Sequence, residues 1–351
     1  MKIHPPSPRA LRVVQWATGN IGSQSLRAVI DHPRLTLSGL YVHTPGKVGR
    51  AAGELCGHDD ATTVRATDDI DEVLSLGADC VLYMPRALDA AAVCRILASG
   101  TNIVTTSTAF HHPPSMDREL CARVEAACWA GGASLYSTGS SPGFITEAVP
   151  LALLSLQRRL GLLSIDEYAD LTHRDSPAML FDVMGFGRDP ADFPTERAAH
   201  LGAGFGPSLR LLAEEMGTPL DSVTAHGEIA VARRTTEIAA GTVTAGTVGA
   251  QRVTVAGRRD GETLLSFRAT WYCTRDLEAD WELRDTGWHI EVDGDAPLDV
   301  DIRFPVPVER MASTFPAYTA HRAVNAVAAV CAAPTGIRTT TELPPFGAAL
   351  A

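Results

Sequence analysis

The chain has 351 residues, of which 45% are hydrophobic and 20% are charged, values typical of a folded protein with room for two domains. Its formal net charge of -11 argues against a nucleic-acid partner, because phosphates are bound by clustered Lys and Arg. The sequence has no run of about 18 apolar residues that predicts a membrane span, and its start lacks the apolar core of a signal peptide, so we expect a cytoplasmic protein.

The first ten residues, MKIHPPSPRA, are rich in proline and predict a flexible arm over residues 1–10. Strand-like and helix-like runs then alternate up to about residue 138. This alternation predicts βαβ units and a Rossmann-type, doubly wound parallel sheet in an α/β domain. The strand-like runs are 12–16, 36–42, 63–66, 79–83, 102–105 and 134–138, and the helix-like runs are 22–31, 70–76, 88–99 and 117–131.

A glycine-containing turn follows the first predicted strand. Its spacing is that of G-x-G-x-x-G with alanine in place of the first glycine. We expect Gly19 to approach phosphates and Gly22 to let the helix lie close to the strand, while backbone N–H groups at the helix start bind the anion. The turn therefore predicts dinucleotide binding, a plain strand–helix turn being the alternative. Its residues are Ala17, Thr18, Gly19, Asn20, Ile21 and Gly22.

The segment after the second strand, HTPGKVGR, bears on the choice of cofactor. NAD sites usually place an acidic residue here, where it binds the ribose 2′-hydroxyl. This chain has His43, Thr44, Lys47 and Arg50 instead, and hydroxyl and cationic groups suit a 2′-phosphate. We expect NADP(H) to be favoured and NAD(H) to be possible. The alternative is that Lys47 and Arg50 are solvated loop charges.

The loops after the fourth, fifth and sixth strands should face the nicotinamide, because ligands lie beyond the carboxyl ends of the strands. We expect Ser141 to be the N-cap of the next helix, with Pro142 at its first position. The N–H groups there would hold a carboxamide, or would serve in ordinary capping. The cofactor contacts predicted in these loops are Met84, Pro85, Arg86, Thr106 and Ser140.

Residues 144–316 predict an α+β domain for substrate binding and oligomerisation, built on a mostly antiparallel sheet with a helix near 208–216. Asp260 and Gly261 between two strand-like runs predict a hairpin. A last helix over about 317–332 carries one apolar stripe and is expected to return to the first domain. The dinucleotide-binding domain therefore comprises 11–143 with 317–351. Asn325 either reaches the cofactor amide or is a helix-packing amide.

Two pairs of polar residues are candidates for catalysis. His111 and His112 follow the fifth strand, and an imidazole exchanges protons near neutral pH; the alternative is a histidine that caps the backbone before two prolines. His173 and Asp175 open the second domain's contribution, with a surface charge cluster as the alternative. The seven cysteines form no C-x-x-C and predict small buried side chains in a reducing compartment, and no spacing predicts a metal site.

Five segments resemble a bacterial family with a dihydrodipicolinate reductase-like N-terminal domain, related to 2,4-diaminopentanoate dehydrogenase and native amine dehydrogenases. The resemblance implies a Rossmann domain, an α/β substrate domain and a homodimer or larger assembly. It also implies hydride exchange between a nicotinamide cofactor and a C=N or C=O carbon of a small molecule. The segments are VVQWATGNIG, YVHTPGKVG, STGSSPGFITEAVPL, DVMGFG at 182–187 and VNAVAAVCAAPTGI at 324–337.

Departures from the family pattern narrow the function. The stretch DLTHRDSPAML puts His173 where dihydrodipicolinate reductases have lysine, so dihydrodipicolinate itself is not the expected substrate. The segment VTTSTAFHHPPS lacks the glutamate that amine dehydrogenases place after the fifth strand, so imine and carbonyl substrates both stay open. A sugar dehydrogenase is disfavoured because Glu-Lys-Pro is absent after that strand. An NADP-binding sensor or scaffold without turnover is the alternative from another class.

Overall fold

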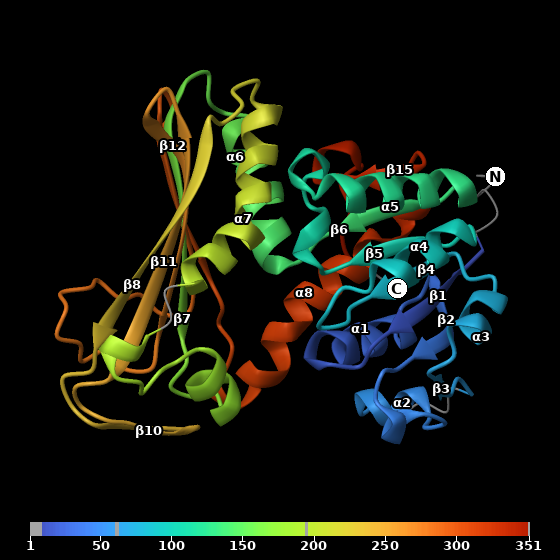
Figure 1. Ribbon diagram of the computed structural model, residues 1–351, viewed down its shortest axis with the longest axis horizontal. Helices are drawn as coiled ribbons and strands as arrows, with labels where there is room; N and C mark the ends of the chain where they lie inside the picture. Colours follow the sequence, from blue (N-terminus) through green and yellow to red (C-terminus); the bar gives the residue numbers. More distant parts are fainter. Residues whose placement is uncertain (1–8, 60–62, 194–195, 350–351) are drawn as a thin grey trace, which may run out of the picture. The chain divides into compact units, whose positions relative to one another are not determined.

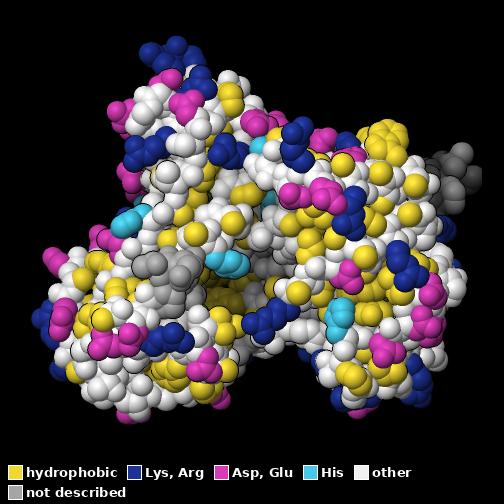
Figure 2. Space-filling view, viewed as in Figure 1, with side chains coloured by type: hydrophobic (Ala, Val, Ile, Leu, Met, Phe, Trp, Pro, Cys, Tyr) yellow, Lys and Arg dark blue, Asp and Glu magenta, His cyan; other side chains and the backbone are white. Residues whose placement is uncertain are grey.

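The computed structural model of the chain describes residues 9–59, 63–193 and 196–349, and it divides into two compact units (Figure 1). The first unit comprises Met1–Phe144 and Ser313–Ala351, and the second comprises Ile145–Ala312. Most of the predicted arm lies outside the described residues. Within them, no helix is both long and apolar enough to cross a membrane. On the face drawn in Figure 2, acidic and basic side chains are interspersed over both units.

A seven-stranded parallel sheet forms the centre of the first unit, in the order β15-β6-β5-β4-β1-β2-β3. The chain order reverses between β1 and β4, so the sheet is doubly wound as predicted. The seventh strand, β15, was not predicted. The strands are β1 Leu11–Trp16, β2 Leu35–Tyr41, β3 Ala66–Thr67, β4 Cys80–Tyr83, β5 Asn102–Thr105, β6 Ser134–Ser137 and β15 Gly336–Arg338.

Helices cover both faces of this sheet, because alternate residues of each buried strand point to opposite sides. Val14, Val81 and Ile103 pack on one side with residues of α3, α4 and α5. Val13 and Val104 pack on the other side with residues of α1 and α8. The helices are α1 Asn20–Ile30, α2 Ala52–Cys56, α3 Ile70–Ser75, α4 Ala90–Ala98, α5 Arg118–Gly131 and α8 Val308–Cys331.

Short helical turns connect several of these elements. Three of them, η1, η2 and η3, follow β2 and β5, and η7 follows β15 near the carboxyl end of the chain. Two others, η5 and η6, belong to the second unit. Their bounds are η1 Pro45–Lys47, η2 Thr108–Phe110, η3 Pro113–Ser115, η5 Ala178–Val183, η6 Pro190–Asp192 and η7 Thr340–Glu342.

The second unit is built on a six-stranded sheet in the order β14-β13-β7-β12-β11-β8, in which only β7 and β12 pair in parallel. This matches the predicted mostly antiparallel sheet. A separate ribbon pairs β9 with β10. The elements are α6 Val149–Leu154, β7 Leu160–Asp170, α7 Glu196–Glu215, β8 Ser222–Val231, β9 Thr236–Ile238, β10 Gly241–Val243, β11 Val248–Arg259, β12 Glu262–Tyr272, β13 Gly287–Gly294 and β14 Leu298–Arg303.

Helix α7 lies against β8, β11 and β12 (Figure 1). The rings of Phe205 and Phe267 stack there, with centroids 4.0 Å apart. The predicted hairpin joins β11 to β12, and both Asp260 and Gly261 have positive φ, the conformation that a tight two-residue turn needs.

The strand predicted at 63–66 is found as the two-residue β3 at Ala66–Thr67, and three predicted helix starts also differ from the structure. Helix α7 begins at Glu196 rather than near 208 and contains Pro207, and α8 begins at Val308 rather than at 317 and contains Pro316. Proline inside a helix removes one backbone hydrogen bond and often ends the helix. We therefore predicted that each helix starts just after its proline, which is too late in both cases. The third difference, at Ser141 and Pro142, concerns the candidate site.

Candidate functional site

The turn between β1 and α1 is held by its own neighbours. Ala17 adopts a left-handed backbone with φ of 75°, in the place where the dinucleotide motif has its first glycine. The buried Gln15 side chain donates through Nε2 to the Ala17 carbonyl oxygen at 3.0 Å. The Ser23 N–H then donates to the Gly19 carbonyl at 2.8 Å and begins the helix. The chain therefore bends sharply as it leaves the strand and enters α1.

The two glycines of the turn have different surroundings. A Cβ at Gly22 would lie 2.2 Å from the Ala17 carbonyl oxygen, a backbone atom that cannot move aside. A Cβ at Gly19 would meet nothing within 4 Å, and the φ of this residue, -74°, is open to any amino acid. Gly22 is therefore needed for packing, whereas Gly19 leaves open space in front of the helix start.

The amino end of α1 suits an anion. Gly19 is its N-cap and supplies no side-chain hydrogen bond, and the first turn contains no acidic residue. The first N–H groups of a helix have no partner within the helix, and its dipole favours negative charge at this end. The residues present therefore fit a dinucleotide pyrophosphate, with the open space at Gly19 as the cradle.

Lys47 brings a positive charge to the same turn. Its Nζ lies 2.9 Å from Thr18 Oγ1 and 3.1 Å from the Thr18 carbonyl oxygen. Arg50, predicted to act with it, is exposed and pairs with Glu54 at 2.7 Å. His43 is exposed and lies edge-on to the Tyr41 ring at 5.2 Å, and Thr44 precedes η1. Of the four residues predicted for the ribose loop, Lys47 is thus the one that contacts the glycine turn.

Aromatic side chains end three neighbouring strands, a feature that our sequence reasoning missed. Trp16, Tyr41 and Tyr83 are the last residues of β1, β2 and β4. The Trp16 and Tyr41 rings stack at 3.6 Å, and Tyr83 lies 5.7 Å from Trp16. Burial raises the pKa of both Tyr41 and Tyr83, so their phenols stay protonated at neutral pH. An aromatic residue at each strand end was the signal available in the sequence.

The loops after β4 and β5 hold the next predicted residues at the same edge. Met84 is buried in the core, Pro85 is half-buried, Arg86 is exposed and Thr106 is half-buried. The adjoining Thr105 donates through Oγ1 to the Tyr83 carbonyl at 2.8 Å, which ties the two loops together.

His111 and His112 are both buried, each with 3% of its surface exposed. The Nδ1 atom of His112 lies 2.6 Å from Ser115 Oγ. The partner is a side chain, and His112 makes no side-chain cap hydrogen bond to the turn that follows it, so catalysis and backbone capping both stay predictions for the pair.

The loop after β6 corrects one prediction. Ser141 is not an N-cap and Pro142 is not helical: both are extended, the bond between them is cis, and Gly143 has a φ of 115°. The helical conformation starts only after Gly143, within η4, Ser140–Ala148. A Cβ at Gly143 would lie 3.0 Å from Thr138 Oγ1, so the chain turns tightly against β6 before the helix begins.

Helix α8 supplies partners for this loop. Ser140, a predicted cofactor contact, is joined to Thr319, with the two hydroxyl oxygens 2.7 Å apart. Arg322 donates through Nε to Thr138 Oγ1 at 3.0 Å. Asn325 is half-buried one turn further along the helix. Asn325 was predicted from the sequence as a cofactor contact on this helix, whereas Arg322 was not.

The candidate residues of the second unit follow β7. His173 and Asp175 are exposed, as the surface-cluster alternative expects, and the nearby Asp170 side chain accepts from Thr172 Oγ1. They belong to a different unit from the glycine turn, and their catalytic role stays a prediction.

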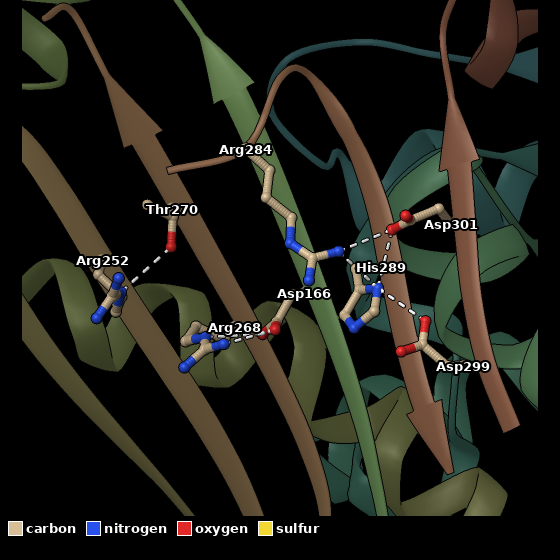
Figure 3. A network of polar contacts seen from close by, with 8 residues as sticks. All are labelled: Asp166, Arg252, Arg268, Thr270, Arg284, His289, Asp299 and Asp301. Carbon is tan, nitrogen blue, oxygen red and sulfur yellow. Dashed lines mark hydrogen bonds and ion pairs between the residues drawn. The ribbon is translucent and has the colours of Figure 1, made fainter. Parts of the chain in front are cut away.

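A polar network occupies the second unit's sheet on the strands β7, β12, β13 and β14 (Figure 3). Arg268 binds Asp166 through two hydrogen bonds of 2.7 and 2.5 Å. Asp301 lies 2.9 Å from both Arg284 Nη1 and His289 Nδ1, and the His289 hydrogen bond holds its pKa below the ordinary value. Arg252, also drawn in Figure 3, donates to Thr270 Oγ1 at 3.3 Å instead of pairing with an acid.

A hollow of about 690 Å³ lies beside part of this network. Its lining includes Tyr168, Arg275, Arg284, Trp288, His289 and Asp301. Two carboxylates, Asp285 and Asp301, are among the lining residues and pair with Arg275 and Arg284. A third arginine, Arg303, also lines the hollow and shares Asp301 with Arg284, so the lining keeps an excess of positive charge.

The seven thiols are all free, and three of them, Cys80, Cys128 and Cys273, are buried. Burial raises the pKa of Cys128 and of Cys273 to about 12, so neither is a thiolate nucleophile at neutral pH. Among the described residues, no group of three or more His, Cys, Asp and Glu side chains is placed to hold a metal ion.

Comparison with known proteins gives three kinds of match. The family described as 2,4-diaminopentanoate dehydrogenase C-terminal domain matches residues 194–351. An amine dehydrogenase of Streptomyces virginiae is 29% identical over 351 residues, covering 95% of this chain and 96% of that protein. The amine dehydrogenase structure from Mycobacterium smegmatis has 22% identity and a TM-score of 0.75, with 97% of each chain covered.

A further solved structure, GenD2 from gentamicin A biosynthesis in complex with NAD, has 16% identity and a TM-score of 0.51 and covers 93% of this chain and 89% of that one. The structural matches bear on the fold alone. The family and sequence matches confirm the relation to 2,4-diaminopentanoate dehydrogenase and the amine dehydrogenases that the sequence segments predicted.

Proposed function

We propose that this relative of the amine dehydrogenases is an NAD(P)-dependent oxidoreductase that reduces the C=N carbon of an imine, or oxidises the corresponding amine. The observation that carries the proposal is the turn at residues 17–22, where Gly19 opens onto an uncapped helix start and Lys47 lies against Thr18. The sequence match to an amine dehydrogenase over nearly the whole chain supports the choice of an amine or imine carbon.

The nicotinamide dinucleotide, when bound, supplies or accepts the hydride. The chain's own contribution is to hold and orient it. The first N–H groups of α1 would bind the pyrophosphate, and the Lys47 ammonium adds a charge beside them. The stacked Trp16 and Tyr41 rings keep the strand ends in place behind the turn.

NADP(H) is the proposed preference over NAD(H). The residues after β2 are Val42, His43 and Thr44, so no carboxylate stands where it would bind a ribose 2′-hydroxyl and repel a 2′-phosphate. Lys47 contacts the turn at Thr18, whereas Arg50 pairs with Glu54. This preference rests on charge: a carboxylate favours the hydroxyl, whereas a cation favours the phosphate.

Reduction of an imine adds one hydride to carbon and one proton to nitrogen, so a proton donor is needed beside the nicotinamide. We propose His111 for this role, at the carboxyl edge of β5. The neighbouring His112 has its Nδ1 bonded to Ser115 and is the weaker candidate.

The experiment is a spectrophotometric assay of NADPH oxidation with a panel of ketones, each with and without ammonia. The proposal expects oxidation that requires ammonia, because the imine forms only when the amine donor is present. Oxidation that is independent of ammonia would replace imine reduction by carbonyl reduction. Tight binding of NADPH with no oxidation across the panel would contradict an enzymatic function.

A further inference from the structure

Arg322 is a half-buried cation on α8 at the carboxyl edge of β6. Its Nε donates to Oγ1 of Thr138, the first residue after that strand. The same stretch of helix binds the adjoining loop through Thr319 and Ser140. The guanidinium is therefore fixed at the edge of the sheet where ligands of this fold lie.

No carboxylate lies within 4 Å of Arg322 among the described residues, and its hydrogen bond to Thr138 uses only Nε. A guanidinium has five N–H donors in a planar fork, so the four on Nη1 and Nη2 remain for another partner. Nη1 and Nη2 of Arg322 are not among the buried side-chain atoms that lack a hydrogen-bond partner. Because neither atom has a hydrogen-bond partner in the part of the chain that the structure describes, both must be accessible to solvent. Four other arginines of this unit differ: Arg9, Arg50, Arg95 and Arg338 each pair with an acid.

Two aromatic rings flank the guanidinium. Its Cζ lies 4.8 Å from the centroid of Phe346 and 5.5 Å from that of Phe144. Both distances are within the range of a cation–π contact, which holds the flat guanidinium in place without using its N–H donors. Apolar rings also lower the local dielectric, so a negative group that binds there interacts more strongly than it would in water.

We propose that Arg322 binds a carboxylate of the substrate through its Nη1 and Nη2 atoms, so that the enzyme acts on oxo acids or the corresponding amino acids. The inference rests on the proposed function and names the substrate class of the same site. A planar fork with two parallel donors matches the two oxygens of a carboxylate, and such charge-assisted pairs are the stronger hydrogen bonds. An amine without a carboxylate lacks the two anionic oxygens that this fork matches.

The test compares short-chain oxo acids, from pyruvate to levulinate, with their neutral amides, using wild type, Arg322→Met and Arg322→Lys. Methionine keeps the apolar stem without the charge, and lysine keeps the charge without the fork. The matched control is Arg95→Met, because Arg95 is an exposed residue on α4 that is paired with Asp71. Binding is measured by saturation-transfer NMR without cofactor, and KM is measured with NADPH and ammonia.

We expect Arg322→Met to weaken binding of the oxo acid and to raise its KM by roughly 10- to 100-fold, the value of a lost charged hydrogen bond. The same variant should leave the amide and the NADPH dissociation constant unchanged. Arg322→Lys should recover part of the loss, and Arg95→Met should behave as wild type. A structural role for Arg322 would instead weaken acid and amide alike.

The outcomes separate the inference from the proposed function. If no substrate is turned over but the acid binds to wild type and not to Arg322→Met, the proposed function fails and the carboxylate site stands. If turnover occurs and Arg322→Met discriminates acid from amide no differently from wild type, the inference is overturned and the function stands. A loss confined to NADPH affinity also overturns it, because the guanidinium would then serve the cofactor.

Discussion

The turn at residues 17–22 and the loop at residues 139–143 both contain glycine, and both follow strands of the same parallel sheet, yet they are held in different ways. The turn is fixed within its own stretch of chain and by the next strand and loop: the Gln15 side chain bonds Ala17 and Ser23 bonds Gly19, while Tyr41 bonds Ala17 and Lys47 bonds Thr18 from no more than 29 residues away. The loop is fixed by Thr319 and Arg322, which are 179 and 184 residues away from their partners. A motif that is held locally can be recognised from the sequence, whereas one that is held by a distant helix cannot.

The largest expected effect comes from Gly22, on which the local account of the turn depends. Gly22→Ala places a Cβ against the Ala17 carbonyl, and the strain should lower the free energy of unfolding by about 1–3 kcal/mol and NADPH affinity by about 100-fold. Thermal unfolding and calorimetry measure the two effects. Gly19→Ala is the matched control for stability, since its Cβ meets no atom of the chain within 4 Å. Equal stability of the two variants would show that the turn is not held as described.

The difference between local and distant contacts also explains which parts of the fold could be predicted from the sequence. The Rossmann sheet, the hairpin at Asp260 and Gly261 and the packing of the last helix all follow from local patterns, and the structure has them. Strand β15 has only three residues, too few for a pattern. Ser141 and Pro142 form a good helix start in the sequence, but the close approach of Gly143 to Thr138 delays the helix.

The residues of the candidate site also differ in whether the local sequence predicts their contacts. We predicted Lys47 as a cofactor contact from its charge and its position in the loop after β2, and its Nζ contacts Thr18 Oγ1. Arg50 carries the same charge but pairs with Glu54, an outcome that depends on the conformation of α2. Arg322 was missed because nothing in its own segment shows that it will meet Thr138 and Phe346.

His111 tests whether the loop after β5 takes part in the chemistry. A lost proton donor typically slows a reaction by 100-fold or more, so His111→Gln should lower kcat by about 100-fold with little change in NADPH affinity. Steady-state kinetics over a range of pH measures both the loss and the ionisation that disappears with it. The control is His112→Gln, which loses the hydrogen bond to Ser115. This variant should lower the melting temperature and leave kcat close to that of wild type. Wild-type turnover in His111→Gln would remove this residue from the mechanism.

Lys47 and Arg50 carry the same charge in one loop region but have different partners, so they test whether contact with the glycine turn matters for cofactor binding. Lys47→Ala removes the ammonium beside Thr18 and should weaken NADPH binding by about 10-fold. Arg50→Ala breaks only an exposed ion pair with Glu54 and should change the NADPH dissociation constant by less than about twofold. Fluorescence titration with NADPH and NADH gives the four dissociation constants. If wild type binds the two cofactors equally, the argument from the missing carboxylate is wrong.

Ala17 provides the smallest expected effect. Its left-handed backbone is strained for alanine and free for glycine, so Ala17→Gly should raise the free energy of unfolding by about 0.5 kcal/mol after the greater freedom of the unfolded chain is counted. Urea denaturation measures the change. A clear loss of stability would mean that the Ala17 methyl group packs in a way that outweighs the strain.

The most direct test of the central claim, that the turn binds a dinucleotide, is calorimetric titration of NADPH into wild type and Gly19→Val. A Cβ at this position meets no atom within 4 Å, so the valine projects into the open space in front of α1 and the fold should be kept, with the melting temperature lowered only by the loss of a glycine N-cap. We predict binding to wild type and a loss of at least about tenfold in the variant. Equal binding to both proteins, or binding to neither, would contradict the account.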